Sequence, residues 1–274
     1  MYTQSEIEKT FGLSRGKAPL LVSVPHSGTL IPDQLVSQMT EAASGSIDSD
    51  WFMRELYEPI VSQLGGSLVY PIYSRYVIDL NRPDNDQSLY PGMTTTGLCP
   101  TERFDGAPLY EAGQRPSSHE KSRRLDLYWR AYHHALKSEL ARLVEQHGYV
   151  LLWEGHSIRS VVPRLFDGRL CDLNIGTNQG HSCHSLIEQN LSTFLPSVSA
   201  DYTSIVNGRF KGGHITRFYG QPMQGIHAVQ LELSQSTYLQ NENKPSWDVK
   251  YAQPISMVIK QLIEVSLDAL NKAG

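Results

Sequence analysis

The sequence is poor in cysteine. Its three cysteines, Cys99, Cys171 and Cys183, are an odd number and form no CxxC pair. Disulfide frameworks use an even set of cysteines, and thiolate zinc sites use closely spaced pairs. The sequence therefore predicts neither a disulfide-stabilised secreted domain nor a cysteine zinc site. A reducing compartment fits this composition, and we expect a cytoplasmic protein.

Long apolar runs and a strong net charge are also missing. No segment reaches the roughly 18 apolar residues that a membrane-spanning helix requires. The first 17 residues contain charged side chains and lack the apolar core of a signal peptide. The formal net charge is only -4, and the basic residues are scattered. We therefore expect a small-molecule substrate and no nucleic-acid or membrane partner, while the oligomeric state stays open.

The composition that remains is typical of a globular α/β protein. Of the 274 residues, 40% are apolar and 19% are charged, which is enough apolar material for a sizeable core. Short apolar runs alternate with segments of helical periodicity, a pattern that predicts helices flanking a mostly parallel or mixed central sheet. The expected strands are 20–24, 67–73, 76–80, 149–153, 170–175 and 228–233, and the expected helices are 53–64, 129–144 and 255–270.

The domain organisation is predicted to be simple. We find no internal repeat and no domain boundary, so residues 1–274 are expected to form a single α/β domain. Residues 83–116 lose the periodic pattern and are rich in Pro, Gly, Thr and Asp. Such a long segment inside a compact domain is more often an ordered functional loop than a linker, and we expect it near the site.

Two histidines each lie just beyond a predicted strand. His26 follows the run at 20–24, and His156 follows the run at 149–153. Ligands of open α/β sheets bind beyond the carboxyl ends of the strands, so both imidazoles can converge on one metal ion. The alternative is that each histidine only bonds backbone in its turn. Glu154 can orient an imidazole, or it is simply a satisfied carboxylate at the strand end.

A catalytic zinc usually has three protein ligands, so a carboxylate should accompany the two histidines. Asp48 and Asp50 are the candidates. Both precede a predicted helix, and either can instead be its N-cap. We assign Asp50 to the metal and leave Asp48 as a cap or as a partner of a ligand. Histidine and carboxylate ligands also accept manganese, iron, cobalt or nickel, so the prediction is one divalent ion, with zinc preferred.

Glu232 is the predicted proton shuttle. It is flanked by leucines within the predicted strand at 228–233. A carboxylate in such surroundings must be paired, face a metal or have a raised pKa, and each of these suits a general base acting on water. A buried ion pair with an arginine is the alternative.

Several cations are candidates for substrate binding. Asn81 and Arg82 follow the predicted strand at 76–80, and an arginine fork matches a carboxylate bidentately. They predict a clamp for an acidic substrate, with a salt bridge to a neighbouring aspartate as the alternative. Arg75 is a weaker candidate. Arg217, in a glycine-containing segment, is a further cation that can contact substrate.

Five short motifs together resemble a known family. Residues 24–28, 48–51, 74–83, 154–157 and 230–233 closely resemble the N-formylglutamate amidohydrolase family, and the resemblance runs from about residue 15 to 265. It implies a phosphorylase/hydrolase-like fold related to the zinc carboxypeptidases and aspartoacylases. It also implies hydrolysis of N-formyl-L-glutamate to formate and L-glutamate in histidine degradation.

The resemblance to carboxypeptidase-like sites is only partial. Those sites take a histidine and a glutamate three residues later as ligands, whereas Thr29 stands three residues after His26. By contrast, Asn81 and Arg82 are similar to the pair that holds the substrate carboxylate there, and Glu232 is similar to the late catalytic glutamate.

Two other functions remain open at the level of sequence. The first is a metal-dependent deacylase or exopeptidase for another N-acyl amino acid or a short acidic peptide. The second is a small-molecule binding protein on the same scaffold, without turnover. A serine hydrolase is disfavoured because no GxSxG elbow is present.

Overall fold

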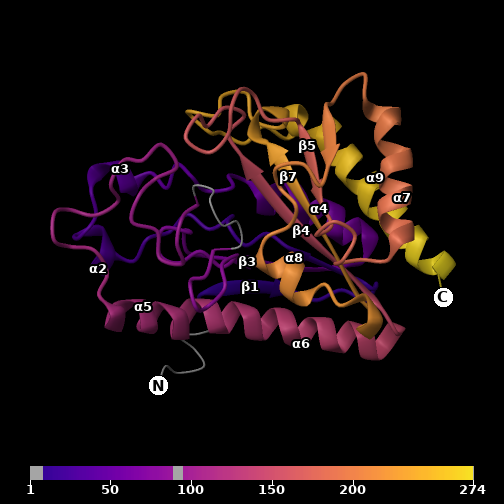
Figure 1. The fold of residues 1–274 in the computed structure, drawn as a ribbon, viewed down its shortest axis with the longest axis horizontal. Coiled ribbons are helices and arrows are strands. Elements are labelled where there is room, and N and C mark those ends of the chain that lie inside the picture. Colours follow the sequence, from indigo (N-terminus) through magenta and orange to yellow (C-terminus); the bar gives the residue numbers. More distant parts are fainter. Residues whose placement is uncertain (1–8, 89–94, 274) are drawn as a thin grey trace.

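A mixed sheet of seven strands forms the centre of the protein in the computed structural model, which describes residues 9–88 and 95–273. The order across the sheet is β1-β3-β2-β4-β7-β5-β6 (Figure 1). The neighbours β3, β2, β4 and β7 are parallel, whereas β1 and β5 run antiparallel to β3 and β7. This arrangement confirms the predicted fold class. The strands are β1 (Phe11–Ser14), β2 (Leu20–Ser23), β3 (Ser67–Pro71), β4 (Val150–Ile158), β5 (Leu173–Gly176), β6 (Ser204–Val206) and β7 (Ile226–Ser234).

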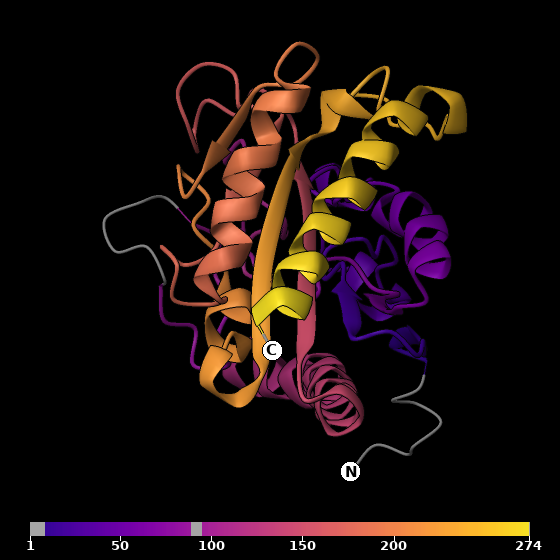
Figure 2. The same cartoon turned by 90° about the vertical axis from the view of Figure 1, so that its right-hand side faces the viewer.

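Helices cover both faces of this sheet. The assigned α-helices are α2 (Asp33–Val36), α3 (Glu41–Ser44), α4 (Met53–Leu64), α5 (Ser118–Arg124), α6 (Arg130–His147), α7 (Ser185–Phe194), α8 (His214–Tyr219) and α9 (Val249–Ala273). α4, α7 and α9 pack on one face, and α6 packs on the other (Figures 1 and 2). Within the described parts of the chain, no helix combines the length and the apolar character needed to cross a bilayer.

The central strand β4 explains how two cores are separated. Its side chains alternate, so that Leu151 and Trp153 enter the core under α4, α7 and α9, while Val150 and Leu152 enter the core under α6. All four are fully buried, as expected for a parallel strand covered on both faces. The alternation therefore decides which face each later residue of β4 occupies.

The helix predictions at 53–64, 129–144 and 255–270 are confirmed by α4, α6 and α9. Most strand predictions are also confirmed, but β4 is longer than expected because it pairs with β7 along its whole length, from Val150↔Ile226 to Ile158↔Ser234. His156 therefore lies inside β4, not beyond it. The predicted strand ended at residue 153 because polar residues usually end a strand. In the structure, the polar residues that follow continue β4 and pair with β7.

The predicted strand at 76–80 is wrong. The segment consists of turns, with the Val77 amide donating to the Ser74 carbonyl at 2.9 Å and the Asp79 amide to the Leu98 carbonyl at 2.7 Å. Tyr76 and Val77 are nevertheless fully buried in the core under α6. A short apolar run that is buried on all sides has no periodicity that distinguishes a strand from a packed turn.

The long loop predicted at 83–116 contains no assigned helix or strand in its described parts, 83–88 and 95–116; residues 89–94 lie outside the described residues. It is packed at several points. Leu98, Leu109 and Tyr110 are buried, and the Leu98 amide donates to Asp86 at 2.6 Å.

His133 ties α6 to the turn at 76–82 and to α8. Its Nε2 donates to the Leu80 carbonyl at 2.9 Å, and its Nδ1 lies 2.9 Å from the Tyr219 hydroxyl. Burial lowers the pKa of His133 to about 3, so the ring is neutral in the folded protein. In the unfolded chain the same histidine titrates near its ordinary pKa, about 6.5.

This difference predicts a pH-dependent stability. His133 contributes its full stabilisation above about pH 6.5, and the contribution is lost as the pH falls toward 3, because the unfolded chain takes up the proton first. His133→Gln keeps a neutral donor and removes this titration. The free energy of unfolding, measured with urea at pH 4 to 6, should fall less steeply by about 1.4 kcal/mol per pH unit in the variant. The exposed neighbour provides a matched control, since His134→Gln should keep the wild-type slope. An unchanged slope in His133→Gln would contradict the assignment.

Candidate active site

Two histidines and one aspartate from distant parts of the chain meet at the carboxyl ends of the central strands. His26 follows β2, Asp50 precedes α4 and His156 lies on β4. The imidazole centroids are 4.8 Å apart. Asp50 Oδ2 lies 3.1 Å from His156 Nδ1 and 3.7 Å from His26 Nδ1. These buried donor atoms all lie within 4.8 Å of one another, so the group can hold a metal ion.

The donor set fits a metal ion in two respects. Ligand atoms at about 2.0–2.2 Å from a tetrahedral ion lie about 3.3–3.6 Å from each other, and both distances to Asp50 are close to this range. In addition, His26 Nε2 lies 2.7 Å from Asp79 Oδ1, and His156 Nε2 lies 2.6 Å from Glu154 Oε1. A carboxylate that accepts the Nε2 proton leaves Nδ1 of its ring directed toward Asp50. There Nδ1 hydrogen-bonds Asp50 when it is protonated and can bind an ion when it is deprotonated, which is how proteins orient metal-binding histidines.

Acidic side chains are concentrated around this group. Buried carboxylates are costly unless cations compensate them. Four buried carboxyl groups lie around the two histidines, namely Asp50, Asp79, Glu154 and Glu232, and the guanidinium groups of Arg75 and Arg82 both lie within 4 Å of Asp79. A divalent cation beside Asp50 would add to the compensation that these cations give.

The two aspartates are ionised despite their burial. Burial alone would raise the pKa of Asp50, but hydrogen bonds from His156 and His26 outweigh it and hold the pKa below its ordinary value. Asp79 behaves in the same way: burial would raise its pKa, but the charges of His26 and Arg75 hold it well below the usual range. Both carboxylates are therefore available as charged partners of the imidazoles.

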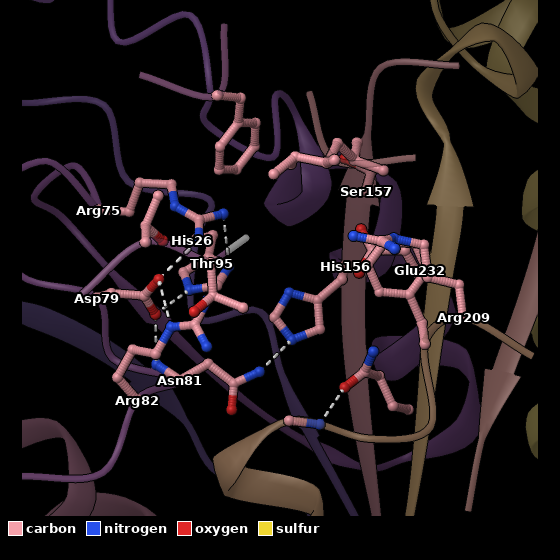
Figure 3. A pocket seen from close by; sticks show the side chains of 17 residues that line it. His26, Arg75, Asp79, Asn81, Arg82, Thr95, His156, Ser157, Arg209 and Glu232 are labelled. Atoms are coloured by element: carbon pink, nitrogen blue, oxygen red, sulfur yellow. Dashed lines mark hydrogen bonds and ion pairs between the residues drawn. The ribbon is translucent and has the colours of Figure 1, made fainter. Parts of the chain in front are cut away.

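Glu232 lies beside this group. It is directly opposite His156 in the register between β4 and β7, so both side chains occupy the same face of the sheet and line one cavity (Figure 3). Burial raises the pKa of Glu232 to about 8, and the charge of Asp50 adds to the effect. A carboxyl group in this setting can hold or release a proton near neutral pH.

Three of the four predicted substrate-binding residues also line this cavity, namely Arg75, Asn81 and Arg82. Arg75 donates to Asp79 Oδ2 at 2.6 Å and lies 3.2 Å from His26 Nδ1. Asn81 Oδ1 accepts from the Ile215 backbone amide at 2.8 Å. The side-chain nitrogen Nδ2 of Asn81 lies 3.0 Å from His156 Nε2.

The position of Arg82 is set through its backbone. A π-helical turn (Leu125–Trp129) joins α5 to α6, and the Trp129 indole donates to the Arg82 carbonyl at 2.9 Å. The guanidinium Nε lies 3.7 Å from Asp79 Oδ2, and the side chain is 16% exposed. Arg82 therefore reaches the cavity from the same turn that supports His26 and His156.

The structure does not bring Arg217 to the cavity. Its Nε donates to the Gly212 carbonyl at 2.8 Å, and it is absent from the described residues that line the cavity. Asp48 also lies outside the group at the histidines. It accepts from the Tyr76 hydroxyl and the Phe104 amide, both at 2.8 Å, and it does not cap α4, whose N-cap Phe52 makes no side-chain capping bond.

Two residues of the site were not anticipated from the sequence. Asp79 was expected at most to pair with Arg82. In the structure it hydrogen-bonds the His26 imidazole and also accepts from the Asn81 backbone amide at 2.9 Å. The only signal was an aspartate in a short polar segment, a context typical of turns. Arg209, on the loop between β6 and α8, also lines the cavity, and no local pattern marks it.

Comparisons with known proteins agree on one family. The family model described as N-formylglutamate amidohydrolase matches residues 18–239. Two curated relatives are both named N-formylglutamate deformylase. The one from Pseudomonas putida is 46% identical over 95% of this chain and 97% of its own length, and the one from Pseudomonas aeruginosa is 45% identical over 94% and 96%.

Solved structures support the same fold. The crystal structure of N-formylglutamate amidohydrolase from Ralstonia eutropha JMP134 superposes with a TM-score of 0.78 at 22% identity, covering 96% of this chain and 98% of that chain. A gene product of Agrobacterium tumefaciens superposes with a TM-score of 0.72 at 18% identity, covering 98% and 99%. At these identities the likeness concerns the fold alone. On the family match and the two relatives at 45–46% identity, the chain belongs to the N-formylglutamate amidohydrolase family.

Proposed function

We propose that this protein hydrolyses N-formyl-L-glutamate to formate and L-glutamate, as a metal-dependent step of histidine degradation. The observation that carries the proposal is one cavity lined by His26, His156, Glu232 and arginines, with Asp50 between the two imidazoles. This combination offers a metal group, a proton carrier and cations for an anionic substrate. The names of the two curated relatives supply the substrate.

His26, Asp50 and His156 would hold the ion, through Nδ1 of each imidazole and a carboxylate oxygen. A divalent ion, zinc by preference, would lower the pKa of water toward neutrality and polarise the formyl carbonyl. Asp79 and Glu154 keep the two imidazoles oriented by accepting their Nε2 protons.

Glu232 moves the proton in this proposal. Its carboxylate takes a proton from the attacking water and then returns it to the amide nitrogen as the C–N bond of the formamide breaks. The bond between the formyl carbon and the water oxygen forms in the first step, and glutamate leaves as a neutral amine in the second. The placement of Glu232 opposite His156 puts the proton carrier and the proposed metal group on one face of the sheet.

Asn81 and Arg82 would bind the α-carboxylate of the substrate. Arg82 can form the bidentate pair, and Asn81 adds an amide donor from the adjacent position. Arg75 is already bonded to Asp79. Its role is therefore to add positive charge next to the reacting carbonyl.

We also propose the cellular setting and the domain organisation. The three cysteines are free, and Cys99 and Cys183 are buried, which suits a cytoplasmic protein. We propose a single domain over residues 1–274, because strands from both halves of the chain build one sheet and one site.

Replacing Glu232 by glutamine tests the proton carrier. Glu232→Gln keeps the size and polarity of the side chain but cannot take up the proton. Formate release should fall in kcat by at least about 10²-fold, the usual scale for general acid–base catalysis. Glu264→Gln, on the exposed side of α9, should keep wild-type activity. A Glu232→Gln variant with full activity and normal metal content would exclude this role.

Metal removal tests the other half of the proposal. Dialysis against a chelator should abolish formate release, and one equivalent of zinc, cobalt or manganese should restore it, because the ion would lower the pKa of the attacking water and polarise the carbonyl. His156→Ala should purify with much less metal than the wild type, measured by elemental analysis, whereas the exposed His181→Ala should not. Full activity in a preparation depleted of metal would contradict the proposal.

A further inference from the structure

A third arginine lines the cavity that contains the two histidines. Arg209 lies on the loop between β6 and α8, far in sequence from Arg75 and Arg82. Figure 3 shows Arg82 and Arg209 on opposite sides of His156. Two cations separated within one cavity suit a ligand with two separated negative charges.

The loop that carries Arg209 is held at both ends. At one end, the Asn207 amide donates to the Ile175 carbonyl at 2.7 Å, and its side-chain oxygen accepts from the Thr177 amide at 2.9 Å. At the other end, the Gly213 amide donates to Gln230 Oε1 at 2.7 Å. A Cβ on Gly213 would lie 2.2 Å from the Asn81 amide nitrogen, so the loop packs directly against the proposed α-carboxylate clamp. Such anchoring gives Arg209 a defined position relative to Asn81.

Two aromatic rings lie beside the Arg209 guanidinium. The Cζ atom of Arg209 lies 5.6 Å from the Phe166 ring centroid and 5.8 Å from the Phe210 ring centroid. Phe210 lines the cavity as well. Aromatic rings orient a planar guanidinium and exclude water beside it, which strengthens a bidentate contact with a carboxylate.

Arg82 and Arg209 lie on different structural elements. Arg82 belongs to the turn whose Asp79 and Asn81 contact His26 and His156, and its Nε lies 3.7 Å from Asp79 Oδ2, so the turn places it close to the two imidazoles. In an N-formyl amino acid, the α-carboxylate also stands at a fixed distance from the formyl group. The side chain is the variable part, and Arg209 comes from a separate loop on the other side of His156.

We propose that Arg209 binds the side-chain carboxylate of the substrate and thereby selects N-formyl derivatives of acidic amino acids. This inference rests on the proposed deformylase function and adds the residue that recognises the side chain of the substrate. Arg82 then binds the carboxylate common to all N-formyl amino acids, and Arg209 binds the one that distinguishes glutamate.

The test compares two nearly isosteric substrates, N-formyl-L-glutamate and N-formyl-L-glutamine, in the full-length protein loaded with metal. Arg209→Met should lower kcat/KM for the glutamate derivative by about 10- to 100-fold, mainly through KM, which corresponds to the loss of a hydrogen bond to a charged group. The value for the glutamine derivative should stay nearly unchanged. Arg209→Lys should recover part of the preference, and Arg82→Met should lower both values.

Lys211→Met is the matched control, because it removes the same charge from the same loop at a residue outside the described lining of the cavity. It should leave the ratio of the two kcat/KM values unchanged. That ratio is measured within one preparation, so partial misfolding of a variant does not alter it. If Arg209→Met lowers both values equally, or leaves the ratio at the wild-type level, the inference is overturned and the deformylase function stands. If the wild type releases no formate from N-formyl-L-glutamate, the proposed function and this inference both fail.

Discussion

Two carboxylate–imidazole hydrogen bonds decide what this site can do. Asp79 holds His26 at 2.7 Å, and Glu154 holds His156 at 2.6 Å. Each bond places the proton on Nε2 and turns Nδ1 toward Asp50. If either carboxylate were absent, its imidazole could rotate or reverse its tautomer, and the three donor atoms would no longer face one point. The proposed metal group, and with it the proposed chemistry, depends on these two bonds.

The fold supplies each carboxylate with further partners. Glu154 lies in β4 and accepts hydrogen bonds from the backbone amide of Thr216 in α8, at 2.9 Å, and from the Thr216 hydroxyl. Asp79 lies in a turn and accepts from Arg75 and from the Asn81 amide. Burying so many charges costs free energy that apolar side chains of similar size would not cost. We infer that this cluster is present for function, at some expense of stability.

How much of this was predictable depends on how local each signal is. The helices at 53–64 and 129–144 follow from apolar periodicity, and strands such as β2 and β7 follow from short apolar runs. His26 and His156 could be singled out because they follow such runs, and Glu232 because it interrupts one. Asp50 could not be separated from Asp48 by sequence reasoning, since both precede α4, and only their partners differ.

The features that sequence reasoning missed are tertiary. The full length of β4 is set by its pairing with β7, and the buried turn at 76–80 is set by packing under α6. Arg209 reaches the cavity from a loop that is anchored by tertiary hydrogen bonds at Asn207 and Gly213. None of these contacts produces a periodic pattern in the sequence.

The central claim is that His26, Asp50 and His156 bind one ion through the two Nδ1 atoms. Crystals grown with zinc, with diffraction recorded above and below the zinc absorption edge, would locate the ion directly. The account predicts one anomalous peak about 2.0–2.2 Å from both Nδ1 atoms and from an Asp50 oxygen. Zinc bound through an Nε2 atom, or zinc at another site with no peak between these three residues, would contradict it.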